Sequence, residues 1–275
     1  MDQIVFYKMS GSGNDFIIID NRNRVVNKND LQDFIAKVCR RKMSVGADGL
    51  ILVEESENVD FKWRFFNSDG SSAEMCGNGA RCAARFAYLN GISGTKVFFE
   101  TEAGIVSAIV ENDQVKIKMP DPIDFKTDYN LELRNGSMQV SSVNTGVPHV
   151  VITVGDIDDV EVVKTGREIR LHDSYAPAGT NVNFICAGNN NTISIRTYER
   201  GVEDETLACG TGSVAAAIVM HYKSKGKSPV KVITRGGGYL YIYFKENAGR
   251  FYNVFLEGDA RVIYKGFLRE DALKV

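Results

Sequence analysis

The chain has 275 residues, 44% of them hydrophobic and 25% charged, which is the composition of an ordinary globular protein. Its formal net charge of −2 gives no bulk attraction to nucleic acid or to a membrane surface, so neither is expected as a partner. The first ten residues, MDQIVFYKMS, lack the basic start and apolar stretch of a signal peptide, and a cytoplasmic location is expected. The five cysteines form no C-x-x-C pair and the three histidines are widely scattered, so neither a disulfide framework nor a metal site is predicted.

Along the chain, the residue pattern predicts helices over residues 30–40, 77–90 and 210–223. Segments rich in β-branched and aromatic residues predict strands over 61–66, 95–101, 105–111, 115–119, 193–198, 230–234, 240–244 and 251–256. Turn residues at 112–113 and 247–249 separate neighbouring strands as hairpins. Residues 121–130 carry charge and proline with little periodicity, and are expected to form a linker between two halves.

An internal repeat relates these two halves. The sequence Cys-Gly-Asn-Gly at residues 76–79 is matched by Cys-Gly-Thr-Gly at 209–212, which lies 133 residues later. The same offset aligns GNDFIII with GVPHVVI, GADGLIL with GTNVNFI, and TEAGIV with TRGGGY. A duplication retained only for folding would explain the pattern. We favour two similar halves that face each other across a cleft, because the repeated feature includes a reactive side chain.

Each cysteine of the repeat stands at the start of a predicted helix. The first N–H groups of a helix have no intrahelical partner and the helix dipole is positive there, so this position favours a thiolate and binds carboxylates. The glycines that follow leave the backbone accessible to a ligand. Two such cysteines could reach opposite faces of one carbon atom, where one removes a proton and the other donates one. The pair therefore predicts inversion of a stereocentre without a metal or organic cofactor. A single cysteine would more often be a small buried hydrophobic residue.

Several motifs in this order resemble the diaminopimelate epimerase family. They are MCGNGARC (75–82), ERG with ETLACGTGS (199–213), GSGNDFIIID (11–20), GADGLI (46–51), FNSDGS (66–71), GVPHVV (146–151) and GTNVNF (179–184). The resemblance extends over the whole chain. It implies a cofactor-independent enzyme that interconverts L,L- and meso-diaminopimelate, for lysine and peptidoglycan precursor synthesis, and that is commonly a homodimer.

The resemblance also implies an α+β fold of two pseudo-symmetric domains, each a mostly antiparallel, barrel-like sheet wrapped around a central buried helix. We expect one domain over residues 1–122, completed by 266–275, and the other over 123–265. By the same resemblance, Cys76 and Cys209 are the catalytic base and acid, and His149 and Glu199 assist them. The residues expected to bind substrate are Asn14, Asn67, Gly77, Asn78, Asn181, Glu199, Arg200, Gly210 and Thr211.

Two features depart from the commonest form of the family. Val147 stands where many relatives have Asn, which removes one polar contact, and we interpret it as a variant. The loop before Cys209 contains three acids at 203–205, which would oppose a thiolate if they turned inward; we expect them to face solvent.

Two alternatives remain open. One is a racemase or epimerase of the same fold that acts on another amino acid, such as proline or hydroxyproline. The other is a thiol redox sensor in which Cys76 and Cys209 form a switchable disulfide. Turnover of several amino acids separates the first from diaminopimelate epimerisation, and activity of the reduced protein separates the second.

Overall fold

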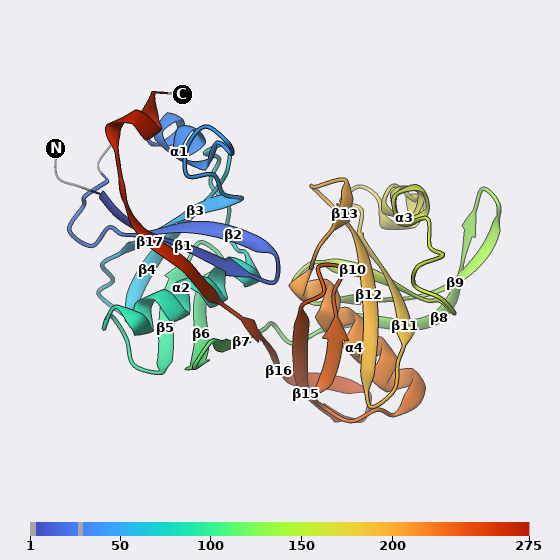
Figure 1. Cartoon of the computed structure of the whole chain (residues 1–275). Helices are drawn as coiled ribbons and strands as arrows, with labels where there is room; N and C mark the ends of the chain where they lie inside the picture. The colour runs from blue at the N-terminus through green and yellow to red at the C-terminus, as the bar shows by residue number, and fades with distance from the viewer. Residues whose placement is uncertain (1–3, 27–29, 275) are drawn as a thin grey trace. The chain divides into compact units, whose positions relative to one another are not determined.

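The computed structural model describes residues 4–26 and 30–274 (Figure 1). The chain forms two compact units. The first comprises Met1–Ile117 and Gly258–Val275, and the second comprises Lys118–Glu257. Among the described residues, no helix is long and apolar enough to span a bilayer.

The first unit is a sheet of mixed direction. Its elements are β1 (Ile4–Gly11), β2 (Asn14–Asp20), α1 (Leu31–Cys39), β3 (Gly49–Glu54), β4 (Phe61–Asn67), α2 (Gly77–Leu89), β5 (Lys96–Thr101), β6 (Gly104–Glu111), β7 (Gln114–Lys118), β17 (Arg261–Leu268) and the 3₁₀ helix η2 (Glu270–Leu273). Strand β1 pairs antiparallel with both β17 and β2. The pairs β2–β3 and β4–β5 are parallel, whereas β3–β4, β5–β6 and β6–β7 are antiparallel.

Helix α2 is the centre of this unit. It contacts β1, β2, β3, β5 and β6 (Figure 1). Small side chains such as Ala80, Ala83 and Ala84 are fully buried along it and allow the strands to approach closely. Helix α1 covers another face of the sheet, where Phe34, Ile35 and other apolar residues pack in a separate core with β2 and β3. The sheet is therefore wrapped around one buried helix, as expected.

The second unit repeats this plan. Its elements are β8 (Ile123–Leu133), β9 (Gly136–Asn144), β10 (Pro148–Thr153), α3 (Val162–Arg170), the 3₁₀ helix η1 (Asp173–Tyr175), β11 (Asn181–Ala187), β12 (Thr192–Glu199), β13 (Asp204–Thr206), α4 (Gly210–Ser224), β14 (Val230–Ile233), β15 (Tyr239–Asn247) and β16 (Arg250–Asp259). Helix α4 is the buried centre and contacts β9, β10, β11, β12, β14 and β15.

Strand pairing confirms the duplication. The parallel pairs β2–β3 and β4–β5 of the first unit correspond to β10–β11 and β12–β14 of the second. The antiparallel pairs β1–β2 and β3–β4 correspond to β9–β10 and β11–β12. Helices α2 and α4 begin directly after the two repeated cysteines. The offset of 133 residues read from the sequence thus describes a real structural repeat.

The linker prediction for residues 121–130 is wrong. Strand β8 occupies most of this segment and pairs antiparallel with β9. Its register shifts twice, and Asp124 and Asp128 have positive φ, so its side chains do not follow the strict alternation that identifies a strand. Most of its residues are also at least partly exposed, which removes the hydrophobic signal.

The return of the chain to the first unit begins earlier than predicted. We expected residues up to 265 in the second domain, but residues 258–265 belong to the first unit. The reason is β17, which pairs with β1 from Ile4–Leu268 at one end to Ser10–Arg261 at the other. The N-terminal boundary of the second unit also differs from the prediction, because this unit begins at Lys118 instead of residue 123.

Candidate active site

The first candidate half-site is built around the N-terminus of α2. Cys76 is the N-cap residue, and its sulfur accepts a hydrogen bond from the Gly79 N–H at 3.4 Å. A thiol at this position occupies the place of the usual serine or aspartate cap. Gly79 leaves ordinary packing space, because a Cβ atom there would lie 3.4 Å from the nearest side chain, Ile51. The helix start is therefore neither crowded nor closed by its own packing.

Asparagine side chains link this helix start to the β1–β2 loop. Asn78 is buried and donates to Asn14 Oδ1 at 2.7 Å, and Asn14 in turn donates to Asp48 at 3.0 Å. The loop is shaped by positive φ at Ser12 and Gly13. The structure thus brings the side chains of Asn14 and Asn78 together.

Arg81, one turn into α2, is a residue that sequence reasoning missed. Its side chain is completely buried. The guanidinium donates to Asn78 Oδ1 at 2.9 Å, to Ser12 Oγ at 2.7 Å and to the Asp259 carbonyl at 3.2 Å. Burial lowers its pKa, whereas electrostatic interactions with Cys82, Asp259 and Cys76 oppose this shift. The motif GARC places a cation there, but only the fold shows that it is buried beside Cys76.

In the part of the chain that the structure describes, Asn67 makes no hydrogen bond to Asn14, Asn78 or Arg81. It ends β4, is exposed, and donates to Ser71 Oγ at 3.0 Å within its own turn. Cys82 is fully buried within α2, and burial raises the pKa of its thiol to about 12, which keeps it protonated.

The second candidate half-site surrounds the N-terminus of α4. Cys209 is buried at the N-cap position of this helix, and its sulfur lies 3.5 Å from Thr211 Oγ1. The Ser213 N–H and hydroxyl both bond the Cys209 carbonyl, at 2.9 and 2.8 Å. Thr145 Oγ1 donates to the Thr211 carbonyl at 3.0 Å. These bonds fix the backbone of the first turn. Gly210 packs closely, because a Cβ there would lie 3.1 Å from the end of the Leu256 side chain.

Asn181 and Arg200 form a second linked pair. Asn181 is buried at the start of β11, where it donates to the Pro148 carbonyl at 3.2 Å and accepts from the Arg200 N–H at 2.9 Å. The Arg200 guanidinium donates to the Ala178 carbonyl at 3.2 Å. This uses one of its donors and leaves others for a carboxylate. His149 lies opposite Asn181 in the β10–β11 register.

Glu199 ends β12 and accepts a hydrogen bond from Thr206 Oγ1 at 2.9 Å. Burial raises the pKa of its carboxyl, and the bond from Thr206 opposes this rise. The acidic residues of the neighbouring loop are held by arginines: Glu203 pairs with Arg170 at 3.0 Å, and Glu205 with Arg196 at 2.7 Å. Two of the three acidic side chains are therefore fixed by ion pairs. The backbone of the same segment is fixed by strand β13, which pairs antiparallel with β12.

His149 is 1% exposed, and its Nδ1 lies 3.0 Å from the side-chain nitrogen of Asn183. Burial lowers the pKa of the imidazole to about 3, and the positive charge of Arg200 contributes. Asn183 was not predicted as a site residue, although it lies in GTNVNF beside Asn181. Both Asn183 and Cys209 lie next to Gly212. A Cβ atom added to Gly212 would lie 2.3 Å from the amide oxygen of Asn183 and 3.3 Å from Cys209 Sγ. Asn183 therefore connects His149 to the first turn of α4.

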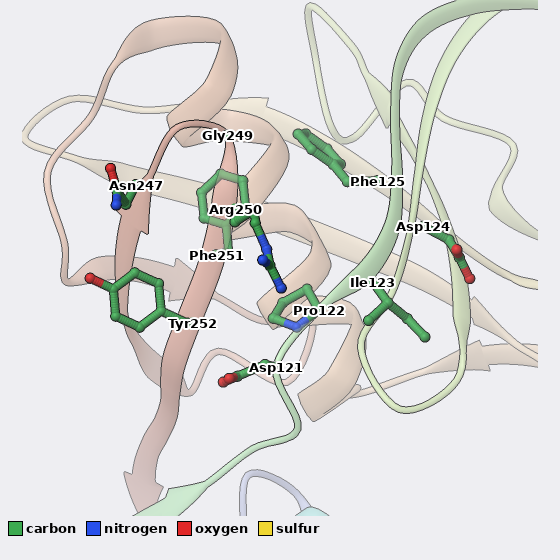
Figure 2. Close-up of a pocket in the computed structure, with 10 residues that line it drawn as sticks. All are labelled: Asp121, Pro122, Ile123, Asp124, Phe125, Asn247, Gly249, Arg250, Phe251 and Tyr252. Carbon is green, nitrogen blue, oxygen red and sulfur yellow. The ribbon is translucent and has the colours of Figure 1, made fainter.

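The second unit has at least two open hollows. The one shown in Figure 2, with a volume of about 660 Å³, lies between residues 121–125 and 247–252 and includes none of the predicted site residues. Phe125 packs edge-to-face on Phe251 beside it. A hollow of about 520 Å³ is lined by His149 together with Tyr175, Thr180 and strands β8 and β9. Only the second hollow adjoins a predicted catalytic residue.

Solved structures with the same fold define the class of protein. A PhzF-family phenazine biosynthesis protein of Bacillus anthracis covers 98% of this chain and all of its own, with a TM-score of 0.73 at 17% identity. A probable proline racemase of Agrobacterium radiobacter K84 covers 97% of this chain and 93% of its own, with a TM-score of 0.70 at 14% identity. These likenesses identify a two-unit α+β fold that is mostly strand with few helices.

The family is shown by sequence. The family profile described as diaminopimelate epimerase matches residues 6–123 and 141–263. The diaminopimelate epimerase of Aquifex aeolicus (strain VF5) is 48% identical over 98% of this chain and 99% of that protein. The chain therefore belongs to the diaminopimelate epimerase family, whose members are isomerases that act without pyridoxal phosphate, and the resemblance inferred from its motifs is confirmed.

Proposed function

We propose that this protein interconverts L,L- and meso-diaminopimelate, with Cys76 and Cys209 as the two acid–base groups. The observation that supports this most strongly is the duplicated helix start. Each unit places one cysteine at the N-cap of a buried helix, inside the same local fold. A duplication that preserves two thiols at two anion-binding positions suits a reaction that needs one group on each face of a carbon atom.

The proposed step conserves atoms and electrons. The thiolate of one cysteine takes the proton from the substrate α-carbon, and the electron pair of the C–H bond is left on that carbon and its carboxylate. The thiol of the other cysteine then gives its proton to the opposite face. Configuration is inverted, and the two sulfurs have exchanged protonation states. The reverse reaction uses the same groups with their roles exchanged.

The helix starts supply the stabilisation that this step needs. Backbone N–H groups at Gly77–Asn78 and Gly210–Thr211 would bind the carboxylate at the reacting carbon, where negative charge develops. Asn14, Asn67 and Asn181 would bind the polar groups of the substrate, and Arg200 the distal carboxylate. Glu199 accepts one hydrogen bond already and offers further acceptor sites to an ammonium group.

The chemistry of the thiols suggests a location. Both sulfurs must be reduced, since a disulfide between them would remove the proton carriers. Reducing conditions of this kind are maintained in the cytoplasm, where the lysine and peptidoglycan precursor would be made. We propose the cytoplasm on this ground.

We further propose that the enzyme is a homodimer. Strand β17 carries three exposed large apolar side chains, Ile263, Tyr264 and Phe267. Exposed apolar side chains on one strand suit coverage by a second copy of the chain. Light scattering coupled to size exclusion measures the state directly. A dimeric wild type that becomes monomeric in Ile263→Asp supports the proposal, and a monomeric wild type at micromolar concentration overturns it.

The function is tested by α-hydrogen exchange. Reduced protein is incubated with L,L-diaminopimelate in deuterated water, and deuterium at the α-carbon is followed by mass spectrometry together with formation of the meso isomer. Deuterated meso product is the expected result. Turnover of proline or hydroxyproline in its place would favour the racemase alternative, and an inactive reduced protein whose binding properties change on oxidation would favour the redox sensor.

A further inference from the structure

The side chain of Asn183 is held in one orientation by three hydrogen bonds. Its nitrogen donates to the Val150 carbonyl at 3.0 Å, and its oxygen accepts from Thr197 Oγ1 at 3.0 Å. Exchanging the amide oxygen and nitrogen would place two acceptors face to face at Val150. A carbonyl cannot donate, so the assignment of the amide follows from the backbone itself.

This orientation determines the protonation of His149. The second N–H of the Asn183 amide points to His149 Nδ1 at 3.0 Å. A nitrogen that receives an N–H donor must carry a lone pair, so Nδ1 is unprotonated. A neutral imidazole then has its proton on Nε2. Nε2 is buried and has no hydrogen-bond partner among the described residues of the protein.

The surroundings of His149 favour the neutral ring. The positive charge of Arg200 acts on it, and His149 is almost completely buried. Asn181, which lies opposite His149 in the sheet register, contributes a neutral amide. A neutral ring with one buried N–H can donate a hydrogen bond and cannot accept one at that atom.

We propose that Asn183 is a positioning residue that keeps His149 as the Nε2–H tautomer, so that His149 donates a hydrogen bond to a carboxylate oxygen of the substrate. This rests on the proposed function for the identity of the substrate. It assigns different partners to the two assisting residues, because His149 would serve a carboxylate and Glu199 an ammonium group. It also excludes His149 as the base that activates Cys209.

The first experiment is ¹⁵N NMR of the histidine rings. The chain has only three histidines, so the signals of His149 are assigned by their loss in His149→Gln. The expected spectrum at neutral pH shows an unprotonated Nδ1 and a protonated Nε2. A proton on Nδ1, in the neutral ring or in an imidazolium, overturns the proposal. This readout needs no turnover, so it distinguishes a wrong tautomer from a wrong function.

Asn183→Asp tests the role of the amide. A carboxylate can only accept, so it should place a proton on His149 Nδ1 and abolish the wild-type spectrum. Asn189→Asp, which makes the same change on an exposed turn, is the matched control and should leave the spectrum unchanged. An unchanged His149 spectrum in folded Asn183→Asp would contradict the positioning role.

Kinetics of His149 variants test the donor role. Gln retains an N–H near the position of Nε2, whereas Phe fills the space without a donor. We expect His149→Gln to keep activity within about tenfold of the wild type, and His149→Phe to lose roughly a further tenfold or more, as for a hydrogen bond to a charged group. Equal losses in the two variants would contradict donation from Nε2.

Discussion

In the first unit, the helix that begins after Cys76 carries the buried cation Arg81, whereas in the second unit the corresponding residue of α4 is the apolar Val214. The second unit instead has the neutral His149 and its partner Asn183 beside the helix start. The two half-sites therefore share a backbone plan and differ in charge. Both units keep a cysteine at the N-cap of the central helix, while the residues around each cysteine differ.

This difference suggests that the two cysteines do not have the same environment before substrate binds. The buried guanidinium of Arg81 interacts electrostatically with Cys82, Asp259 and Cys76, and a positive charge favours the anionic form of a sulfur. In the second unit, the residue of α4 that corresponds to Arg81 is uncharged, and Arg200 donates one hydrogen bond to the Ala178 carbonyl.

The largest expected effect comes from removing either thiol. Cys76→Ser and Cys209→Ser should each lower turnover by roughly a thousandfold, because an alcohol is a much poorer acid–base group than a thiol near neutral pH. Steady-state epimerisation of diaminopimelate measures the loss. Cys186→Ser, on a partly exposed cysteine of β11, is the control and should remain active. Near-normal activity in either active-site variant would contradict the two-thiol mechanism.

Replacing the buried cation tests the asymmetry directly. Arg81→Met removes donors from Asn78, Ser12 and the Asp259 carbonyl, and should lower the free energy of unfolding by about 3 kcal/mol. It should also slow alkylation of Cys76 by iodoacetamide, which reacts with thiolates.

Arg85→Met is the matched control for this change. Arg85 lies on the same helix, is partly exposed, and donates to the Ala260 carbonyl. The Arg85→Met substitution should lower the free energy of unfolding by only about 1 kcal/mol. Equal alkylation rates of Cys76 in the wild type and in folded Arg81→Met would show that the cation does not favour the thiolate.

The neutral histidine of the second unit predicts a dependence of stability on pH. The pKa of His149 is about 3 in the folded protein and near 6.5 when unfolded, so the unfolded state takes up a proton in this range that the folded state does not. Stability therefore falls as the pH is lowered through 6.5, by about 2 kcal/mol between pH 7 and pH 5 from this residue alone. Urea denaturation at both pH values measures the loss, and His149→Gln should show a smaller one.

The glycines of the two helix starts should respond differently to alanine. At Gly212 a Cβ would lie 2.3 Å from Asn183 Oδ1, whereas at Gly79 the nearest atom would lie at 3.4 Å. Replacing glycine by alanine raises helix propensity at both positions. At Gly212 the steric clash outweighs this gain, so Gly212→Ala should lower the free energy of unfolding by about 1 kcal/mol. Gly79→Ala should be neutral or slightly stabilising. Thermal unfolding of both variants measures the difference, and equal shifts would contradict it.

The sequence predicted the fold well where a pattern was repeated. The two cysteine motifs and their offset of 133 residues located both central helices, and the helix at 30–40 corresponds to α1. The same offset applied to α1 leads to α3 (Val162–Arg170), which was not predicted. The chain KTGREIR in α3 contains a glycine and few apolar residues, so the local pattern of a helix is weak there. A glycine is needed at position 166, because a Cβ atom added there would lie 2.4 Å from the side chain of Tyr198.

The candidate site was predictable only in part. Motifs gave the residues that could bind a ligand, but gave no signal that Arg81 is buried or that Asn183 bonds His149. Such contacts depend on which strands become neighbours, as with the parallel pair β10–β11 that places His149 opposite Asn181. Hydrogen-bond direction, and with it the tautomer of a histidine, follows from the assembled network and not from spacing in the chain.

The late return of the chain through β17 also has a consequence for synthesis. The second unit is continuous over Lys118–Glu257, so all of it can fold once residue 257 has left the ribosome. The first unit begins earlier, but β17, one of the two strands that pair with β1, is absent until residues 261–268 are made. During translation β1 is an open strand edge, and the part of the protein made first is the part completed last. Deleting the final fifteen residues would leave that edge permanently uncovered.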